Sequence, residues 1–345
     1  MSAAAFAAPS PSALLRAGGP PARARELAEH WPINGHAAFH ADYGLDDGVL
    51  DRLYVKATQQ QWRIDDYDWS HQFDPDNPLQ MPDGTLLIFG TPLWQRMDDA
   101  ERALTRRHFH AWTLSQVLHG EQGALLCATK LAQGEETLSA RLCASAQVFD
   151  EARHIEVYQR MVTQQMGLGY AMSSGLRSLL QDTIGRQELD ITNLGMQVLV
   201  EGIALSIFHN IVAYSRDPFV KAVVGRIQQD EARHFAVGRT TLRRLYHGEL
   251  SEAEMLQREA FTCEGIHVLY EHLCADDIWQ SLGHDRRACA ALVRDSHVAA
   301  VLRRNLFRRL VPSLKDLGLL RGRVVSQLDA MGMLEYADLP LRMEV

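Results

Sequence analysis

Two short segments of the chain repeat almost letter for letter and carry groups that bind metal ions. Residues 150–154 and 230–234 both read Asp-Glu-Ala-Arg-His. A lone glutamate precedes the glutamate of each segment by 30 residues, Glu121 before Glu151 and Glu201 before Glu231. These positions are all offset by 80 residues between the two halves. The pattern indicates an internal duplication of a helical hairpin.

The residue types in this pattern favour a binuclear metal site. Glu151 and His154 are spaced i, i+3, as are the corresponding residues of the second copy, so each pair shares one helix face. Glu121 and Glu201 lie within apolar helix faces, where an ionised carboxylate costs several kcal/mol unless it is paired or bound to a metal. Four carboxylates and two imidazoles suit two redox-active cations, typically iron and occasionally manganese, whereas zinc prefers fewer and softer ligands.

Helices must bring these groups together. From about residue 98 prolines become rare and the apolar residues follow a helical period, which predicts helices over 98–133, 136–167, 186–215, 218–247, 252–275 and 286–316. Short turns join the first four in antiparallel order. Glu201 and Glu231 are each roughly 15 residues from the turn at Arg216-Asp217, so they return to the same height. We therefore predict an all-α fold, a four-helix bundle with additional N-terminal and C-terminal helices.

Composition divides the chain into four parts and excludes some functions. We expect a disordered tail over 1–25, an aromatic and proline-rich wrapping segment over 26–97, the dimetal four-helix core over 98–247 and appended helices over 248–345. A net charge of −8 argues against nucleic-acid binding, and the sequence has no apolar run of the roughly 18 residues that a membrane span requires. Five cysteines without a CxxC pair favour reduced thiols and a cytoplasmic protein.

The two Asp-Glu-x-Arg-His segments resemble the ferritin-like non-haem diiron oxygenase superfamily over roughly residues 98–247. Within it they are similar to hydroxylases of bacterial multicomponent monooxygenases and to p-aminobenzoate N-oxygenase. This resemblance implies a ferritin-like bundle with six iron ligands, Glu121, Glu151, His154, Glu201, Glu231 and His234. It also implies that Asp150 and Asp230 orient the histidines across the core and that Arg153 and Arg233 neutralise these aspartates.

The sequence departs from the relatives at two positions. The hydroxylases usually have a threonine one turn after the third-helix glutamate, whereas this chain has Ala204 and Leu205 there. The N-oxygenase has a further histidine ligand one turn before its last Glu-x-x-His, and the corresponding residue here is Ile227. Tyr158 occupies the place of the radical tyrosine in the small subunit of ribonucleotide reductase, which the chain also resembles.

The resemblance implies an oxygen-activating diiron monooxygenase that hydroxylates carbon or oxygenates nitrogen in a small organic substrate. The expected cofactor is a pair of iron ions, with a mixed Mn/Fe pair as the variant. Expected partners are O₂, the substrate, a reductase or ferredoxin as electron donor, and a second copy of the chain in a homodimer. Two alternatives stay open: a redox protein that forms a tyrosyl radical at Tyr158, and a ferritin-like iron-handling protein.

Several other residues have a structural and a functional interpretation. Gly120, Gly123 and Gly202 flank the lone glutamates and allow either close helix approach or a local distortion near the metal. We interpret His209, His267 and His272 as structural. The sequence near 302–315 carries a basic face, which is either solvated or a docking patch for an acidic electron donor. Its members are Arg303, Arg304, Arg308, Arg309 and Lys315.

Overall fold

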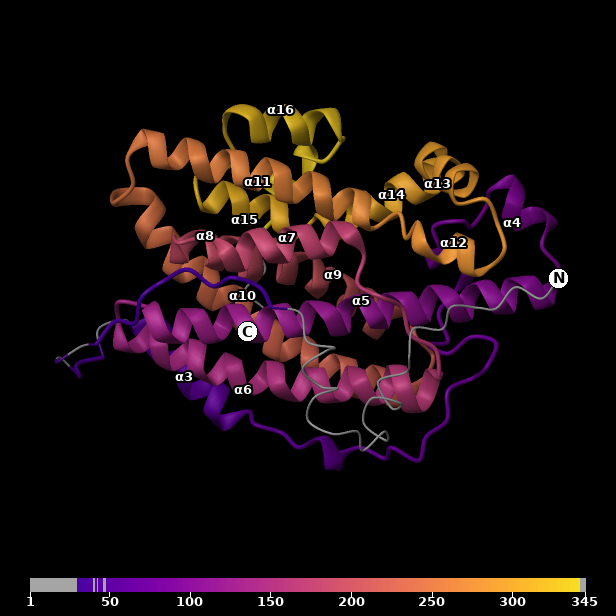
Figure 1. The fold of residues 1–345 in the computed structure, drawn as a ribbon, viewed down its shortest axis with the longest axis horizontal. Helices are drawn as coiled ribbons and strands as arrows, with labels where there is room; N and C mark the ends of the chain where they lie inside the picture. Colours follow the sequence, from indigo (N-terminus) through magenta and orange to yellow (C-terminus); the bar gives the residue numbers. More distant parts are fainter. Residues whose placement is uncertain (1–29, 40, 42, 46–47, 342–345) are drawn as a thin grey trace.

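The regular secondary structure of the part that the structure describes is helical. This computed structural model describes residues 30–39, 41, 43–45 and 48–341, and no β-strand occurs in these ranges. The tail predicted over residues 1–25 lies outside them. Long helices run side by side along the long axis of the molecule, and a second layer of helices covers one face (Figure 1). The all-α prediction is confirmed.

Four long helical stretches form the core bundle. Helix α5 (Asp99–Gly134) packs along α6 (Leu138–Arg160), and α9 (Glu201–Tyr214) packs along α10 (Pro218–Gly248). Two of these stretches contain π-helical turns: α6 continues into η3 (Met161–Met166), and α8 (Leu189–Asn193) continues through η4 (Leu194–Val200) into α9. The predicted bundle helices therefore exist at the expected positions, although the π-turns were not predicted.

Capping residues set where the core helices begin. The Asp98 side chain accepts a hydrogen bond from the backbone N of Glu101 at 2.8 Å, and the Glu101 side chain accepts one from the backbone N of Asp98 at 2.9 Å, which completes a capping box before α5. Asp217 caps α10 through the backbone N of Phe219 and Val220, and Pro218 occupies the first helical position. The cap at Asp217 and the proline after it start α10 directly after the turn that follows α9, so α9 and α10 form an antiparallel hairpin.

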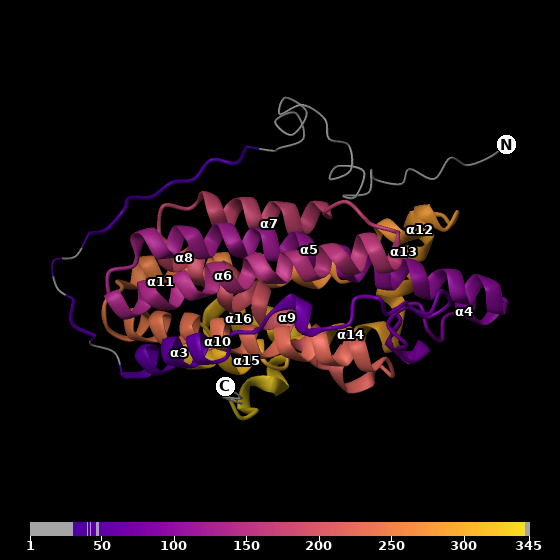
Figure 2. The same ribbon diagram turned by 90° about the horizontal axis from the view of Figure 1, so that it is seen from below.

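The segment before α5 packs along the outside of the bundle. Helix α3 (Gly48–Gln59) lies against α6 and α10, as Figure 2 shows from below. Three shorter helices follow: η1 (Ile64–Asp66), η2 (Asp83–Thr85) and α4 (Pro92–Arg96). Buried aromatic residues such as Trp62 and Phe73 join this segment to an apolar cluster shared with α5, α6 and α10.

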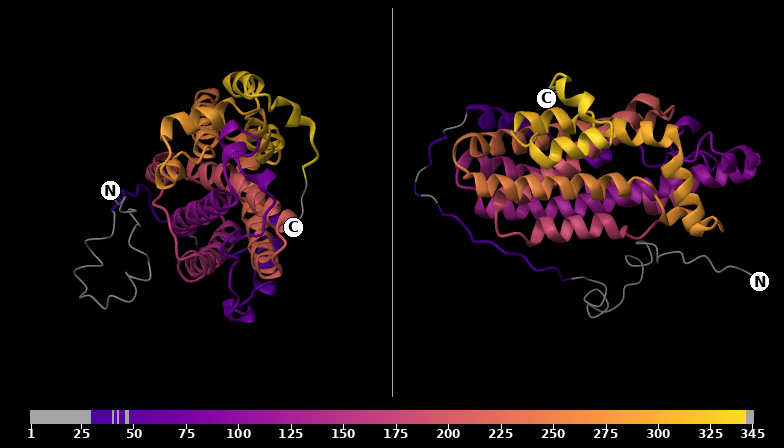
Figure 3. Two further views of the ribbon diagram at one scale, coloured as in Figure 1. Left: turned by 90° about the vertical axis from the view of Figure 1, so that its right-hand side faces the viewer. Right: turned by 90° about the horizontal axis from the view of Figure 1, so that it is seen from above.

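The second layer contains the helices between and after the two hairpins (Figure 3). Helix α7 (Ser174–Gly185) packs between α5 and α11 (Glu252–His272), which in turn packs against α16 (Gly322–Ala330). The other members are α12 (Asp277–Ser281), α13 (Arg286–Asp295), α14 (His297–Leu306), α15 (Leu310–Asp316) and η5 (Leu334–Asp338).

The prediction of one helix over 286–316 is wrong. The helix is interrupted at Ser296, whose hydroxyl caps α14 by accepting from the backbone N of Ala299. It is interrupted again at residues 307–309, before α15. The predicted basic face is divided by these breaks. Arg303 is buried above the ring of Tyr270 and contacts Cys274, whereas Arg308 is exposed.

The third helical stretch of the core is the most apolar. Within the described ranges, Leu189–Tyr214 is the one helix long and apolar enough to cross a membrane by length and composition, but 61% of its 18-residue window is buried inside the bundle. It contributes residues such as Val198 and Phe208 to the apolar core. The five cysteines are also buried, and none forms a disulfide with another.

Candidate metal centre

Six acidic and imidazole side chains converge at the middle of the bundle. Glu121 comes from α5, Glu151 and His154 from α6, Glu201 from the first residue of α9, and Glu231 and His234 from α10. None is more than 5% exposed. The structure thus brings together every residue for which the sequence predicts metal ligation.

The six residues form two overlapping groups, each able to hold one ion. Glu121, Glu151, His154 and Glu231 place one ligand atom each within 4.8 Å of one another. Glu151, Glu201, Glu231 and His234 do the same. Glu151 and Glu231 belong to both groups, so the two candidate ion positions share these carboxylates.

The ring nitrogens and carboxylates face each other closely. Nδ1 of His154 lies 2.9 Å from Oε1 of Glu231, and Nδ1 of His234 lies 3.1 Å from Oε1 of Glu151. The two imidazole centroids are 6.0 Å apart. In each case the nearest carboxylate oxygen therefore belongs to the opposite repeat.

Several of these atoms are buried without a hydrogen-bond partner among the described residues. They are Oε2 of Glu151, Nδ1 of His154, Oε2 of Glu201, Oε1 of Glu231 and Nδ1 of His234. Leaving a buried polar or charged atom unsatisfied costs about 1–3 kcal/mol or more. Because the unsatisfied atoms face one another, the donor set fits cations held between them.

The pKa shifts of the cluster residues also favour cations between them. Burial and the neighbouring carboxylate of Glu231 raise the pKa of both Glu121 and Glu201 well above the usual range. Burial alone would lower the pKa of the His154 and His234 imidazoles, but the surrounding carboxylates outweigh it and raise the pKa of both. The cluster therefore requires positive charge, which protons or metal ions can supply.

The two histidines are oriented by aspartates of the opposite repeat. Nε2 of His154 lies 3.2 Å from Oδ2 of Asp230, and Nε2 of His234 lies 3.2 Å from Oδ2 of Asp150. These contacts leave Nδ1 of each ring facing the carboxylates. The geometry matches the crossed orientation that the resemblance implies.

Two buried arginines balance the charge of these aspartates. Arg153 pairs with Asp150 and also reaches Oδ2 of Asp230 at 3.3 Å. Arg233 pairs with Asp230 and reaches Oδ2 of Asp150 at 3.3 Å. All four side chains are at most 5% exposed, so the pairs are shielded from water. The result is a symmetric network with two positive and two negative groups behind the histidines.

Residues 60–62 cover this network, and sequence reasoning did not identify them as part of the site. Nε1 of Trp62 donates to Oδ2 of Asp230 at 2.7 Å. Gln61 accepts from Arg153 at 2.8 Å, and Gln60 accepts from Arg233 at 3.1 Å. They follow α3, outside the duplicated hairpins, so neither the repeat nor a helical period points to them.

Two glutamines hold the carboxylates from the side. Nε2 of Gln147 lies 3.0 Å from Oε1 of Glu151 and 2.8 Å from Oε1 of Glu201. Gln197 donates to Oε1 of Gln147 at 2.8 Å. Both could have been identified from the sequence, because each lies one turn before a glutamate, Glu151 or Glu201, on a helix face whose other residues are mainly apolar.

Comparison with known proteins now decides the family. The sequence model of the p-aminobenzoate N-oxygenase family, AurF, matches residues 46–318. The chain belongs to this family. It is therefore a diiron oxygenase or oxidase of the ferritin-like class, and its buried Glu/His cluster fits a dimetal cofactor.

Comparison with solved structures and with curated proteins adds no further assignment. Among solved structures, one similar chain is described as a mutant of an R2-like ligand-binding oxidase with an anaerobically reconstituted Mn/Fe cofactor. It has a TM-score of 0.48 and 17% sequence identity, and the match covers 77% of this chain and 92% of that one. No curated protein matches.

Residues around the cluster show how this chain differs from the pattern that the N-oxygenase resemblance implies. Ile227 is fully buried in an apolar cluster, so it supplies no ligand where that pattern has a histidine.

The three glycines that flank the lone glutamates differ in the space around them. A Cβ on Gly123 would lie 2.7 Å from Leu180, and one on Gly202 would lie 3.0 Å from Phe235. Both therefore permit close packing, whereas a Cβ on Gly120 would meet nothing within 4 Å.

Tyr158 lies in an apolar environment beside the cluster. Its ring stacks on Phe208 with centroids 6.0 Å apart, and its hydroxyl is buried without a hydrogen-bond partner among the described residues. Burial raises its pKa well above the usual range.

A small cavity of about 80 Å³ reaches the carboxylates from the side of α5, α9 and α11. Glu121, Glu201 and Glu231 line it together with mainly apolar residues, and no lysine or arginine is among the lining residues. Trp112 and His272 also line the cavity. The indole Nε1 of Trp112 is buried and has no hydrogen-bond partner among the residues that the structure describes, and burial lowers the pKa of His272 to about 4. His272, which the sequence led us to interpret as structural, thus lies at the wall of this cavity.

Proposed function

We propose that this protein is an oxygen-activating diiron monooxygenase that acts on a small, uncharged organic substrate. The residues that would hold the ions are Glu121, Glu151, His154, Glu201, Glu231 and His234, of which Glu151 and Glu231 belong to both candidate ligand groups. The observation that carries the proposal is the pair of overlapping ligand groups whose buried atoms lack other partners.

The metal pair supplies the redox chemistry that activates O₂ and oxidises the substrate. The protein keeps the ligands in place. Asp230 and Asp150 hold a proton at Nε2 of each histidine, which leaves Nδ1 as the metal-binding lone pair. Gln147 donates to Oε1 of both Glu151 and Glu201, which leaves Oε2 of each carboxylate as the oxygen that would bind a metal ion. The apolar lining of the cavity limits the access of water.

The cavity also restricts the substrate. A charged carboxylate would have no cationic partner among the residues that line it, and Glu121, Glu201 and Glu231 would repel it. A neutral amine or an apolar C–H substrate fits better. Because the family is one of N-oxygenases, N-oxygenation of a neutral amine is the reaction we favour, with C-hydroxylation as the variant. Electrons then come from a separate reductase or ferredoxin.

Metal analysis of purified variants tests the proposal. The wild type should bind two ions per chain, and both Glu151→Ala and His234→Ala should lose most of this metal together with oxygen consumption. Glu156→Ala is the matched control, because Glu156 is exposed on the same helix and pairs with Arg160 instead. Full metal loading in either site variant would contradict the assignment, and many ions per chain would favour iron storage.

A radical function is the second candidate, and the burial of Tyr158 beside the cluster favours it. A tyrosyl radical signal after oxygen exposure of the reduced protein, absent in Tyr158→Phe, would support this function. Under the monooxygenase proposal, Tyr158→Phe keeps oxygen consumption and product formation.

A further inference from the structure

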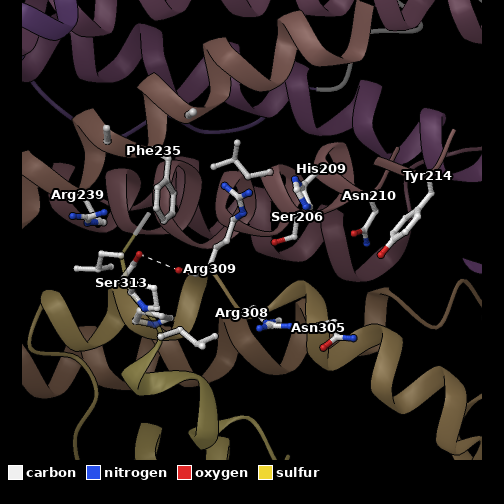
Figure 4. Close-up of a pocket in the computed structure, with 17 residues that line it drawn as sticks. Ser206, His209, Asn210, Tyr214, Phe235, Arg239, Asn305, Arg308, Arg309 and Ser313 are labelled. Carbon is white, nitrogen blue, oxygen red and sulfur yellow. Dashed lines mark hydrogen bonds between the residues drawn. The ribbon is translucent and has the colours of Figure 1, made fainter. Parts of the chain in front are cut away.

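A molecule that reacts at the cluster must travel from solvent to the small cavity beside the carboxylates, here called the inner cavity. Its volume is about 80 Å³, and Glu121, Glu201 and Glu231 line it. A concavity of about 360 Å³ between α9, α10, α14 and α15 (Figure 4) shares no lining residue with the inner cavity. A different one, of about 220 Å³ and here called the outer concavity, does share a residue with it. The outer concavity lies between the first turn of α7, the end of α11, α12 and α13.

His272 separates the inner cavity from the outer concavity. It is the last residue of α11, and it lines both spaces. Leu269 and Leu273, on either side of it in the sequence, line the inner cavity, whereas Val268 and Glu271 line the outer concavity. The end of α11 therefore forms the wall between the two spaces, and at His272 this wall is a single side chain.

Few contacts hold the His272 ring in this position. Its Nδ1 lies 2.7 Å from Oγ of Ser173, and the ring lies against Trp112 with centroids 5.1 Å apart. Nε2 has no hydrogen-bond partner among the residues that the structure describes. Burial lowers the pKa of His272 to about 4, so the ring is uncharged at neutral pH. The side chain can therefore turn aside without breaking an ion pair.

The charges around the outer concavity disfavour anions. Its lining contains three carboxylates and two arginines. Arg286 pairs with Asp277 at 3.0 Å, and Arg294 lies 3.1 Å from Glu271 and 3.0 Å from Asp276. Counting histidines as neutral, one negative charge remains in excess. An organic anion would thus find both arginines already paired, whereas an amine, neutral or protonated, meets no such barrier.

We propose that the outer concavity is the entrance through which an amine substrate reaches the inner cavity, and that His272 is the side chain that turns aside to let it pass. This inference rests on the proposed function, because it takes the inner cavity as the place where the substrate binds. The entrance then excludes organic anions before they reach the carboxylates of the cluster, and His272 restricts the size of the molecules that pass.

A removable obstruction at the entrance tests the proposal. Ser174 is exposed and lines the outer concavity, and the five natural cysteines are buried, so the thiol of Ser174→Cys is the accessible one. It is modified with methyl methanethiosulfonate or with the larger benzyl methanethiosulfonate. Exchange of 4-fluoroaniline with the metal-loaded full chain is then followed by fluorine NMR, which gives the association rate, the dissociation rate and the Kd without turnover.

An obstruction on the path raises the barrier in both directions and leaves the end states unchanged. The benzyl adduct should therefore lower both rates by about fivefold or more, with a Kd within about twofold of the unmodified protein. The methyl adduct should change neither rate by more than about twofold. His272→Ala, which removes the wall, should raise the dissociation rate by about threefold or more.

Ser145→Cys, treated with the same reagents, is the matched control. Ser145 is also an exposed helical serine, but it lies on α6 and lines neither space. Its benzyl adduct should exchange 4-fluoroaniline like the wild type.

The outcomes separate this inference from the proposed function. If 4-fluoroaniline binds but the benzyl adduct at residue 174 leaves both rates unchanged, or weakens the Kd alone, the entrance is refuted and the substrate cavity stands. If 4-fluoroaniline does not bind the wild type at all, the proposed substrate cavity and its entrance both fail.

Discussion

Replacement of Asp230 by asparagine should weaken both the fold and metal binding, because Asp230 connects a histidine of the cluster to two arginines and a tryptophan. Its side chain is fully buried and accepts hydrogen bonds from Trp62 at 2.7 Å and from Arg153 and Arg233, with Nε2 of His154 at 3.2 Å. An asparagine has the same shape, but its amide nitrogen would face one of these donors, and Asp150 would be the one carboxylate left to pair with both arginines.

The size of the effect follows from these contacts. Removing one partner of a buried ion pair costs about 3–5 kcal/mol. Loss of the group that orients a metal-binding histidine typically lowers metal affinity about 10–100-fold. Asp230→Asn should therefore destabilise the metal-free protein by about 3–5 kcal/mol. It should also weaken binding of at least one of the two metal ions.

Two variants separate the parts of this effect. Trp62→Phe removes one hydrogen bond but keeps a ring under Arg153, whose guanidinium lies 4.6 Å from the ring centroid, so it should cost only about 1–3 kcal/mol. Asp150→Asn breaks the equivalent contacts to Arg153, Arg233 and His234 and should resemble Asp230→Asn, but with a smaller loss, since Gln61 approaches Asp150 only to 3.4 Å.

Denaturant unfolding of the metal-free protein gives the stability change, and competition with a chelator gives the metal affinity. If Asp230→Asn retained wild-type metal affinity, the inference that Asp230 positions His154 for a metal would be refuted. If Trp62→Phe were as damaging as Asp230→Asn, the arginine pairs would not be the main contribution.

Other perturbations follow from single side chains. Gly120→Ala should raise the thermal midpoint, since alanine favours a helix interior by about 1 kcal/mol and its Cβ meets no atom within 4 Å, but should weaken binding of aniline, used as a neutral amine probe, because Gly120 lines the cavity. Burial, Glu136 and Asp190 raise the pKa of Glu135 to about 7 in the folded state, so its ionisation lowers stability as pH rises from 4.5 to 7. Glu135→Gln should therefore stabilise the protein by up to about 3 kcal/mol at pH 8 and leave it unchanged at pH 4, as thermal unfolding at both pH values would show. Lys130 is buried and donates to the carbonyl of Ile184 at 3.1 Å near the end of α7, so Lys130→Met should cost about 3 kcal/mol and speed hydrogen exchange in α7.

The dimetal cluster was predictable because its signals are local and repeated. The i, i+3 spacing of Glu151 and His154, and its second copy 80 residues later, fixed which residues share a helix face. The turn before Pro218 then set the height at which the α9 and α10 residues meet. The structure brings all six residues together as the spacing predicts.

The features that the sequence did not predict depend on contacts between residues distant in sequence, or lie in stretches where the apolar pattern shows no change. Trp62 reaches Asp230 across 168 positions, and no periodicity records such a contact. The π-turn η4 falls in a run of almost entirely apolar residues, where one extra residue per turn leaves no visible change of phase. The break at Ser296 did have a local signal, a serine that can cap a helix, but the surrounding apolar period masked it.

The crossed contacts between aspartates and histidines also bear on how such a chain can arise. Neither hairpin contains the acceptor that orients its own imidazole, since Asp150 serves His234 and Asp230 serves His154. An ancestor with one hairpin could complete this arrangement only as a pair of identical subunits. Once both copies were joined in one polypeptide, each could diverge separately. Trp62 is one such difference: it donates to Asp230 at 2.7 Å, whereas Gln61 approaches Asp150 only to 3.4 Å.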